Sequence, residues 1–78
     1  MAAIIWSKPQ CPYCEQAKTL LEMKGIPYEE RKIGSGWTKE QLLEQVPNAR
    51  SVPQIFLDGE LVGGFDQLRT HFNERRGI

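Results

Sequence analysis

The chain has 78 residues, which fits one small domain near the lower size limit for a self-sufficient hydrophobic core. Ten lysines and arginines balance ten aspartates and glutamates, which argues against a nucleic-acid binder and against a protein held on anionic membranes. The apolar run at residues 2–6 is too short for a signal peptide or a membrane span. We therefore expect one domain, residues 1–78, in the cytoplasm, where two cysteines indicate redox or metal chemistry rather than a structural disulfide.

The first elements are a buried strand and an amphipathic helix. Residues 3–6 form a compact apolar run, which is typical of a central strand covered on both faces. From Pro12 the apolar positions recur at helical spacing, and Gly25 followed by Pro27 predicts the end of the helix. The buried face of this helix is predicted to carry Cys14, Ala17 and Leu21.

The middle of the chain predicts an edge strand and a second helix. Residues 27–33 carry charges on both faces, which suits a strand that must resist further pairing. Thr38 and Gln41 have the spacing of a capping box, so a helix is expected to begin there and to end before Pro47. Its apolar side chains, which we expect to be buried, are Leu42, Leu43 and Val46.

A hairpin and a third helix complete the pattern. Asp58-Gly59 lies between two apolar runs and favours a type I′ turn, and Gly63-Gly64 ends the second strand. Asp66 is a candidate cap for a last helix, whose apolar positions are Phe65, Leu68 and Phe72. The order strand, helix, strand, helix, strand, strand, helix begins with a right-handed parallel βαβ unit and ends with an antiparallel hairpin. We expect an α/β fold with a four-stranded mixed sheet and helices on its faces.

The two cysteines lie one helical turn apart in "KPQCPYC". Pro12 is favoured at the first helical position, so Cys11 falls at or beside the N-cap. Unpaired backbone N–H groups and the helix dipole favour the thiolate there, which makes Cys11 the candidate nucleophile. Cys14, one turn further along the same side, is the candidate resolving thiol, against the alternative of a small buried hydrophobic residue.

Metal binding is the main rival interpretation of the cysteine pair. A structural zinc site takes four protein ligands, and the chain offers Cys11, Cys14 and its single histidine, His71. His71 is expected on the solvated surface of the last helix, so we predict no metal site within one chain. An iron-sulfur cluster shared between two chains remains an alternative.

Three motifs in order, "CPYC", "SVPQIF" and "GGFDQL", resemble the glutaredoxins, in particular the short dithiol type of bacteria and phages. The resemblance runs from Ile4 to Phe72. It implies a thioredoxin fold, and it implies that Val52-Pro53 is a cis peptide that faces Cys11. It also implies a glutathione site, whose residues would be Lys8, Tyr13, Val52, Pro53, Gly64, Phe65 and Asp66.

The expected contacts follow the chemistry of glutathione. The backbone of Val52 would pair with the cysteinyl residue as a strand would, and Lys8 would meet the glycyl carboxylate. The N–H groups of Phe65 and Asp66 would bind the γ-glutamyl carboxylate, while the Asp66 side chain would take the ammonium. Lys39 and Arg50 are further candidates for the glycyl carboxylate.

The sequence therefore predicts a glutathione-dependent thiol-disulfide oxidoreductase that needs no bound cofactor. Glutathione, glutathionylated proteins and protein disulfides are the expected partners, with ribonucleotide reductase as an electron acceptor by family analogy. Balanced charge and the lack of a long exposed apolar run predict a monomer. The alternatives are a thioredoxin-like protein served by a flavin reductase and a carrier of a glutathione-ligated iron-sulfur cluster.

Overall fold

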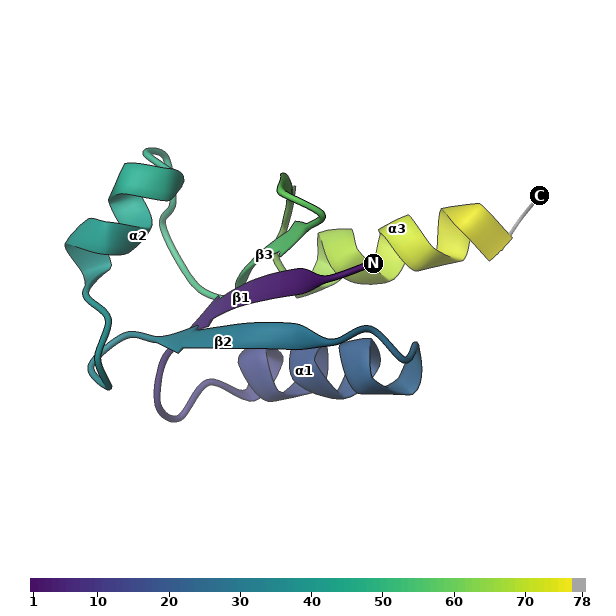
Figure 1. Cartoon of the computed structure of the whole chain (residues 1–78), viewed down its shortest axis with the longest axis horizontal. Helices are drawn as coiled ribbons and strands as arrows, with labels where there is room; N and C mark the ends of the chain where they lie inside the picture. The colour runs from purple at the N-terminus through teal and green to yellow at the C-terminus, as the bar shows by residue number, and fades with distance from the viewer. Residues whose placement is uncertain (77–78) are drawn as a thin grey trace.

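The computed structural model describes residues 1–76. The elements follow the predicted order (Figure 1), and they are β1 (Ala3–Ser7), α1 (Pro12–Met23), β2 (Tyr28–Lys32), α2 (Lys39–Gln45), β3 (Gln54–Leu57), β4 (Glu60–Gly63) and α3 (Phe65–Arg76). Among these elements, no helix is long and apolar enough to cross a lipid bilayer.

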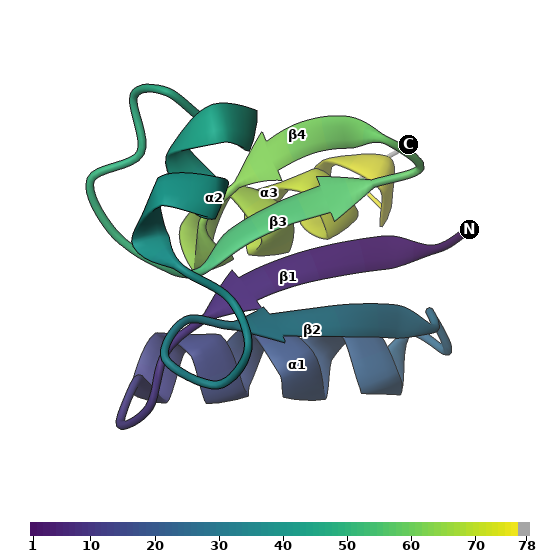
Figure 2. The ribbon, with the colours of Figure 1, turned by 60° about the vertical axis from the view of Figure 1, so that its left-hand side comes forward.

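The four strands form one mixed sheet in the order β2-β1-β3-β4, which Figure 2 shows face on. β1 pairs with β2 in parallel, and β3 pairs with both β1 and β4 in antiparallel fashion. The predicted parallel unit, the hairpin and the edge position of the charged strand β2 are thereby confirmed. β1 is central because its apolar residues are covered on both faces of the sheet.

Side chains from successive strand residues point to opposite faces and divide the core in two. On one face, Ala3, Ile5 and Ile55 pack with residues of α1 and α3. On the other face, Trp6 packs with residues of α2. The buried helix residues are Ala17, Leu21 and Leu68 on the first face and Leu42, with the helix-ending Val46, on the second. Burial of each large aliphatic side chain contributes about 1.5–3 kcal/mol, and it fixes α1 against the sheet.

Local signals place the ends of α2 and the hairpin turn where the sequence predicts them. The Thr38 side chain accepts a hydrogen bond from the Gln41 N–H, and the Gln41 side chain accepts one from the Thr38 N–H, which completes the capping box. Asp58 and Gly59 both have positive φ, as a type I′ turn requires. Leu43, which we expected to be buried, is only half-buried, because it lines an open pocket on the surface.

The cap of α3 differs from the prediction. Gly64, not Asp66, is the capping residue, because its carbonyl accepts the first helical hydrogen bond, from the Leu68 N–H. The Gln67 side chain accepts from the Gly64 N–H at 3.0 Å and so satisfies the cap from within the helix. Asp66 lies in the first turn, where its carboxylate still has a favourable interaction with the helix dipole.

Candidate functional site

The first turn of α1 carries both cysteines. Pro12 is the first helical residue and Cys11 is the N-cap, and its Sγ accepts a hydrogen bond from the Cys14 N–H at 3.2 Å. The two cysteines form a disulfide, and their Cα atoms lie 5.2 Å apart. The side chain of Cys11 is 7% exposed and that of Cys14 is fully buried. An incoming thiol or disulfide therefore reaches Cys11 first.

A short turn leads from β1 to Cys11. It runs through Lys8 and Pro9, both exposed, to Gln10, which has a φ of +57°. A non-glycine residue in the left-handed region costs free energy, so packing on both sides of the turn must hold it there. The turn places Cys11 next to the C-terminal end of β1, and Lys8 lies at the rim of the site.

The Val52-Pro53 segment faces the cysteines from before β3. The peptide bond between the two residues is cis, as the resemblance to glutaredoxins implied. The carbonyl oxygen of Val52 lies 3.9 Å from the Cys11 Sγ. Within residues 1–76, the N–H of Val52 makes no backbone hydrogen bond. This edge of the backbone is therefore open to an extended ligand.

One pocket gathers six of the seven residues expected to bind glutathione. This Tyr13 pocket has a volume of about 260 Å³, and it is lined by Tyr13, Ser51, Val52, Pro53, Gly64, Phe65, Asp66 and Gln67. The Tyr13 ring is 60% exposed and lies 6.2 Å from the Phe65 ring, centroid to centroid. A Cβ on Gly64 would meet the carbonyl oxygen of Pro53 at 3.5 Å, so the start of α3 comes close to the cis-proline loop.

The seventh residue, Lys8, borders a neighbouring pocket. This Lys8 pocket has a volume of about 210 Å³ and includes two further cations, Lys39 and Arg50. Its remaining lining residues are Ile33, Leu42, Leu43, Ala49, Ser51 and Val52. Ser51 and Val52 line both pockets, so the two adjoin at Val52, whose carbonyl oxygen lies near the Cys11 Sγ. Together they form a path with positive charge at one end and the start of α3 at the other.

Sequence reasoning missed Gln67. Its side chain lines the Tyr13 pocket and holds the Gly64 N–H, which fixes the first turn of α3. The signal was present, because glutamine three residues after a capping residue is half of a capping box. Asp66 is also a preferred type of capping residue, so the sequence pattern did not single out Gly64 and Gln67.

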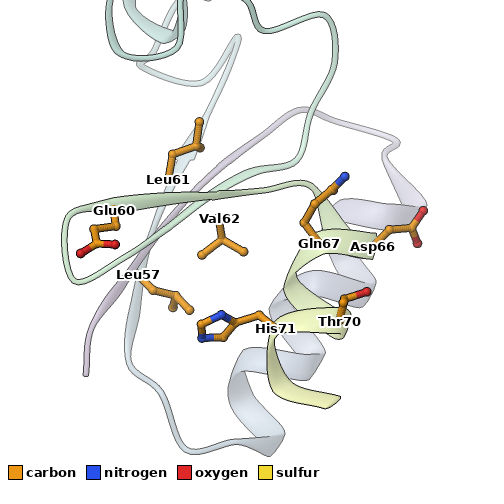
Figure 3. Close-up of a pocket in the computed structure, with 8 residues that line it drawn as sticks. All are labelled: Leu57, Glu60, Leu61, Val62, Asp66, Gln67, Thr70 and His71. Atoms are coloured by element: carbon orange, nitrogen blue, oxygen red, sulfur yellow. The ribbon is translucent and has the colours of Figure 1, made fainter. Parts of the chain in front are cut away.

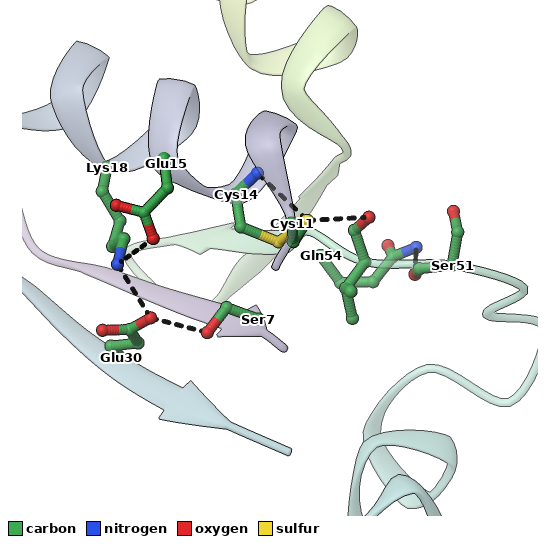
Figure 4. The surroundings of a disulfide bond; sticks show 9 residues. Ser7, Cys11, Cys14, Glu15, Lys18, Glu30, Ser51 and Gln54 are labelled. Atoms are coloured by element: carbon green, nitrogen blue, oxygen red, sulfur yellow. Dashed lines mark hydrogen bonds and ion pairs between the residues drawn. A yellow bond between two sulfur atoms is a disulfide. The ribbon is translucent and has the colours of Figure 1, made fainter. Parts of the chain in front are cut away.

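A charged network beside the disulfide was also missed. The Ser7 hydroxyl donates to Glu30 Oε2 at 2.6 Å, and the Lys18 ammonium lies 3.1 Å from the same oxygen and 2.8 Å from Glu15 (Figure 4). Burial opposes ionisation of Glu30, but the hydrogen bonds from Ser7 and Lys18 outweigh it and hold the pKa of this carboxyl below its usual value. The hydrogen bond to Glu15 exceeds the effect of burial and raises the pKa of Lys18. Both groups are thus charged at neutral pH.

A larger pocket, of about 450 Å³, lies away from the cysteines between the β3-β4 hairpin and α3. Figure 3 shows the His71 ring turned into it, near Leu57 and Val62. His71 is half-buried rather than solvated as we expected, since its ring packs edge-on against Phe72. Among the described residues, no group of three or more His, Cys, Asp or Glu side chains converges on one point.

Comparisons with known proteins agree with this geometry. The glutaredoxin family model matches residues 3–62. Glutaredoxin 3 of Escherichia coli is 39% identical over 64 residues, which are 82% of this chain and 77% of that protein. The superposition on the structure of reduced E. coli glutaredoxin covers 100% of both chains, with a TM-score of 0.81 and 30% identity.

A second similar structure is the buckwheat glutaredoxin-glutathione complex, with a TM-score of 0.80 and 25% identity over 92% of this chain and 68% of the buckwheat chain. Sheet order, helix positions and the paired cysteines at the start of α1 thus agree with the family in sequence and in fold. The chain belongs to the glutaredoxin family of thiol-disulfide oxidoreductases.

Proposed function

We propose that this protein is a glutathione-dependent oxidoreductase that reduces glutathione mixed disulfides and protein disulfides through Cys11 and Cys14. The observation that carries the proposal is that the Tyr13 pocket and the Lys8 pocket adjoin at Val52, whose carbonyl oxygen lies 3.9 Å from the Cys11 Sγ. Glutathione has charged groups at both ends of a short extended peptide, and the path offers complementary groups at both ends.

The middle of the path suits the cysteinyl residue of glutathione. The open backbone edge of Val52 can pair with it as a neighbouring strand would, and this pairing brings the glutathione sulfur to Cys11. Pro53 follows in the cis form and has no N–H of its own to compete for the ligand.

The γ-glutamyl end fits the Tyr13 pocket. The N–H groups of Phe65 and Asp66 belong to the first turn of α3 and have no partner within the helix, so they can donate to the carboxylate. The Asp66 carboxylate is available for the ammonium, while the rings of Tyr13 and Phe65 form one wall. The buckwheat glutaredoxin was solved as its glutathione complex, which supports a site of this kind.

The glycyl end fits the Lys8 pocket. Lys8, Lys39 and Arg50 border this pocket, and all three side chains are exposed. We propose Lys8 as the main partner of the glycyl carboxylate and the other two as its supplements. Their distribution around one pocket gives the carboxylate a favourable field without a buried charge pair.

The reaction with a glutathionylated substrate needs only Cys11. Its thiolate, held by the Cys14 N–H and the helix dipole, attacks the glutathione sulfur, and the bond to the substrate breaks. The substrate leaves as a thiolate and takes up a proton. A second glutathione thiolate attacks the Cys11-glutathione bond, which yields oxidised glutathione and regenerates Cys11 with no bound cofactor.

With a protein disulfide, Cys11 forms a mixed disulfide and Cys14 resolves it. The product is the Cys11-Cys14 disulfide, which two molecules of glutathione reduce. A ribonucleotide reductase is one electron acceptor consistent with this chemistry. We further propose that residues 1–78 act as one monomeric domain in a reducing cytoplasm, which supplies the glutathione.

The test is turnover of the mixed disulfide of glutathione and 2-mercaptoethanol, with glutathione, glutathione reductase and its nicotinamide cofactor. Wild type is compared with Cys11→Ser and Cys14→Ser. We expect Cys11→Ser to be inactive and Cys14→Ser to keep substantial activity, because this reaction uses one thiolate.

Two outcomes would overturn the proposal. If wild type fails with glutathione but works when a flavin-dependent thioredoxin reductase supplies electrons, the protein is a thioredoxin-like reductant. If the purified protein is brown and loses turnover as its visible absorbance rises, a cluster carrier is the better description.

A further inference from the structure

We propose that Lys18 and Glu30 are positioning residues that control how readily Cys14 loses its proton when it resolves a mixed disulfide on Cys11. The inference goes beyond the glutathione site, because it concerns the second cysteine and the charges behind it. It rests on the dithiol chemistry of the family and not on glutathione as the co-substrate.

The charges lie in a shielded position. The side chain of Lys18 is 14% exposed and that of Glu30 is 26% exposed, and Ser7, which donates to Glu30, is fully buried. The three residues come from α1, β2 and the end of β1, and Figure 4 shows them beside the disulfide. Water and salt screen such a pair much less than a pair on the open surface.

Lys18 follows Cys14 by one turn on the same side of α1. Residues i and i+4 lie on the same side of a helix, with Cβ atoms about 5–6 Å apart. Long helical side chains also turn back toward the N-terminus of the helix. The ion pair of Lys18 with Glu15, three residues earlier, shows that Lys18 does so. The ammonium, which contacts Glu15 and Glu30, therefore lies on the side of α1 that carries Cys14, as Figure 4 shows.

Cys14 depends on these charges because it has no contact with water. Its side chain is fully buried, so a thiolate at this position is not hydrated, and the nearest protein charges decide its stability. Lys18 favours the thiolate, whereas Glu15 and Glu30 oppose it. Glu15 is 67% exposed, so water screens its charge more than that of Glu30.

Other charges border this end of the molecule from the remaining elements. Lys32 follows on the same face of β2, Lys8 lies in the turn before Cys11, and Asp66 and Arg69 form an exposed pair at 3.6 Å on α3. The two charges of the α3 pair offset each other, and both side chains are open to water. The field at Cys14 is therefore set mainly from α1 and β2, by Lys18 and its carboxylate partners together with Lys32.

The step in question is the closure of the disulfide. Cys14 releases its proton to water, and its thiolate attacks the Cys11 sulfur of the mixed disulfide. The Cys11-Cys14 bond forms, the bond from Cys11 to the substrate sulfur breaks, and the substrate leaves as a thiolate that takes up a proton. The rate depends on the fraction of Cys14 present as thiolate, and part of any gain is lost because a less basic sulfur is a weaker nucleophile.

The experiment follows closure without glutathione. Reduced protein is mixed with bis(2-hydroxyethyl) disulfide, quenched with acid at intervals and analysed by mass spectrometry for the mercaptoethanol adduct and its loss, between about pH 5 and pH 9. The Cys14→Ser variant should retain the adduct, which shows that the measured step belongs to Cys14. Far-ultraviolet circular dichroism confirms that each variant is folded.

Opposite effects are expected from the two sides of the pair. Glu30→Gln removes a negative charge, so closure at neutral pH should be about threefold faster, with the pH profile shifted to lower pH. Lys18→Met should be about threefold slower, with the profile shifted to higher pH. Lys18→Arg keeps the charge and should restore the wild-type rate. Matched controls are Glu29→Gln and Lys24→Met, on the opposite face of β2 and at the far end of α1, and both should leave closure unchanged.

A structural role predicts a different result. If Glu30→Gln and Lys18→Met change the rate in the same direction, or if neither changes it, the pair only holds α1 to the sheet and the inference is wrong. Should Lys18→Met fail to fold, Glu30→Gln decides alone, because faster closure supports the inference and equal or slower closure overturns it. Failure of glutathione turnover in the earlier test would leave this outcome unaffected.

Discussion

The Lys8 pocket makes a quantitative prediction about the glycyl end of glutathione. Lys8, Lys39 and Arg50 border it, so each is a candidate partner of the glycyl carboxylate. An exposed ion pair contributes at most about 0.5–1 kcal/mol, so replacing any one of the three with methionine should weaken the reaction about two- to fivefold. If the contributions add, the triple variant should lose about 1.5–3 kcal/mol, which is about 10- to 150-fold.

The assay isolates one step and one carboxylate. In a Cys14→Ser background, the rate at which Cys11 acquires a glutathione adduct is measured with the mixed disulfide of 2-mercaptoethanol and glutathione. It is measured again with the mixed disulfide of glutathione amide, in which a neutral carboxamide replaces the glycyl carboxylate. The triple variant should form the adduct more slowly than the protein with all three cations on the first substrate only. Added salt should make this difference in rate smaller, because the charges are exposed.

Equal losses on both substrates would refute the assignment, since a substrate without the glycyl carboxylate cannot lose contact with it. Lys24→Met provides the matched control, because Lys24 is an exposed cation at the opposite end of α1. A comparable effect of Lys24→Met would show that the overall charge, and not the pocket, attracts the substrate.

Two predictions concern stability. Glu30→Gln should lower the free energy of unfolding by about 1–2 kcal/mol at neutral pH. The folded pKa of Glu30 is lowered from 4.5, so the stability that its carboxylate contributes is present above that pH and is lost as the pH falls through the folded pKa. The free energies of unfolding of variant and wild type, measured with urea, should therefore converge in acid. A difference that stays constant with pH would contradict the mechanism. At the hairpin, Asp58 has a φ of +50° and its side chain accepts from the Ala2 N–H. In urea unfolding, Asp58→Asn should leave the free energy of unfolding nearly unchanged, and Asp58→Gly should lower it by about 0.5–1.5 kcal/mol because the hydrogen bond is lost. Asp58→Ala should lower it by about 1 kcal/mol more because alanine is strained at a positive φ. Equal losses for the glycine and alanine variants would refute this explanation.

The elements that the sequence predicted well are those with local causes. Pro12 begins α1, Thr38 and Gln41 cap α2, and Asp58-Gly59 closes the hairpin. Each signal acts within about four residues, over which backbone geometry and one or two hydrogen bonds decide the outcome. The nearness of Cys11 to Cys14 belongs to the same class, because one helical turn separates them.

The errors have causes in the tertiary structure. Asp66 was expected to cap α3, but the chain leaves β4 through Gly63, packs Gly64 against the Pro53 loop and lets Gln67 complete the cap. Leu43 has the pattern of a buried residue, yet in the folded chain it lines an open pocket that Lys8 and Arg50 also border.

The glutathione site was predicted from family resemblance, not from physical reasoning about the residues. Val52 and Phe65 are 41 and 54 positions after Cys11, and no local rule brings such distant segments to one pocket. The resemblance named the residues, and the packing of the cis-proline loop against α3 brings six of them together.

The sequence by itself determined the redox-active dithiol, the order of the elements and their ends, because these depend on neighbours in the chain. Only the tertiary structure decided the environment of Cys14. In the parallel register, Ile5 lies opposite Glu30 and Ser7 opposite Lys32, so Glu30 is on the face that α1 covers and meets Lys18 there. A slip of one residue would turn Glu30 to the α2 face, and the alternation of charges along β2 does not specify which register forms. Burial of Ile5 and Tyr28 against α1 selects the register, and with it the charges around the second cysteine.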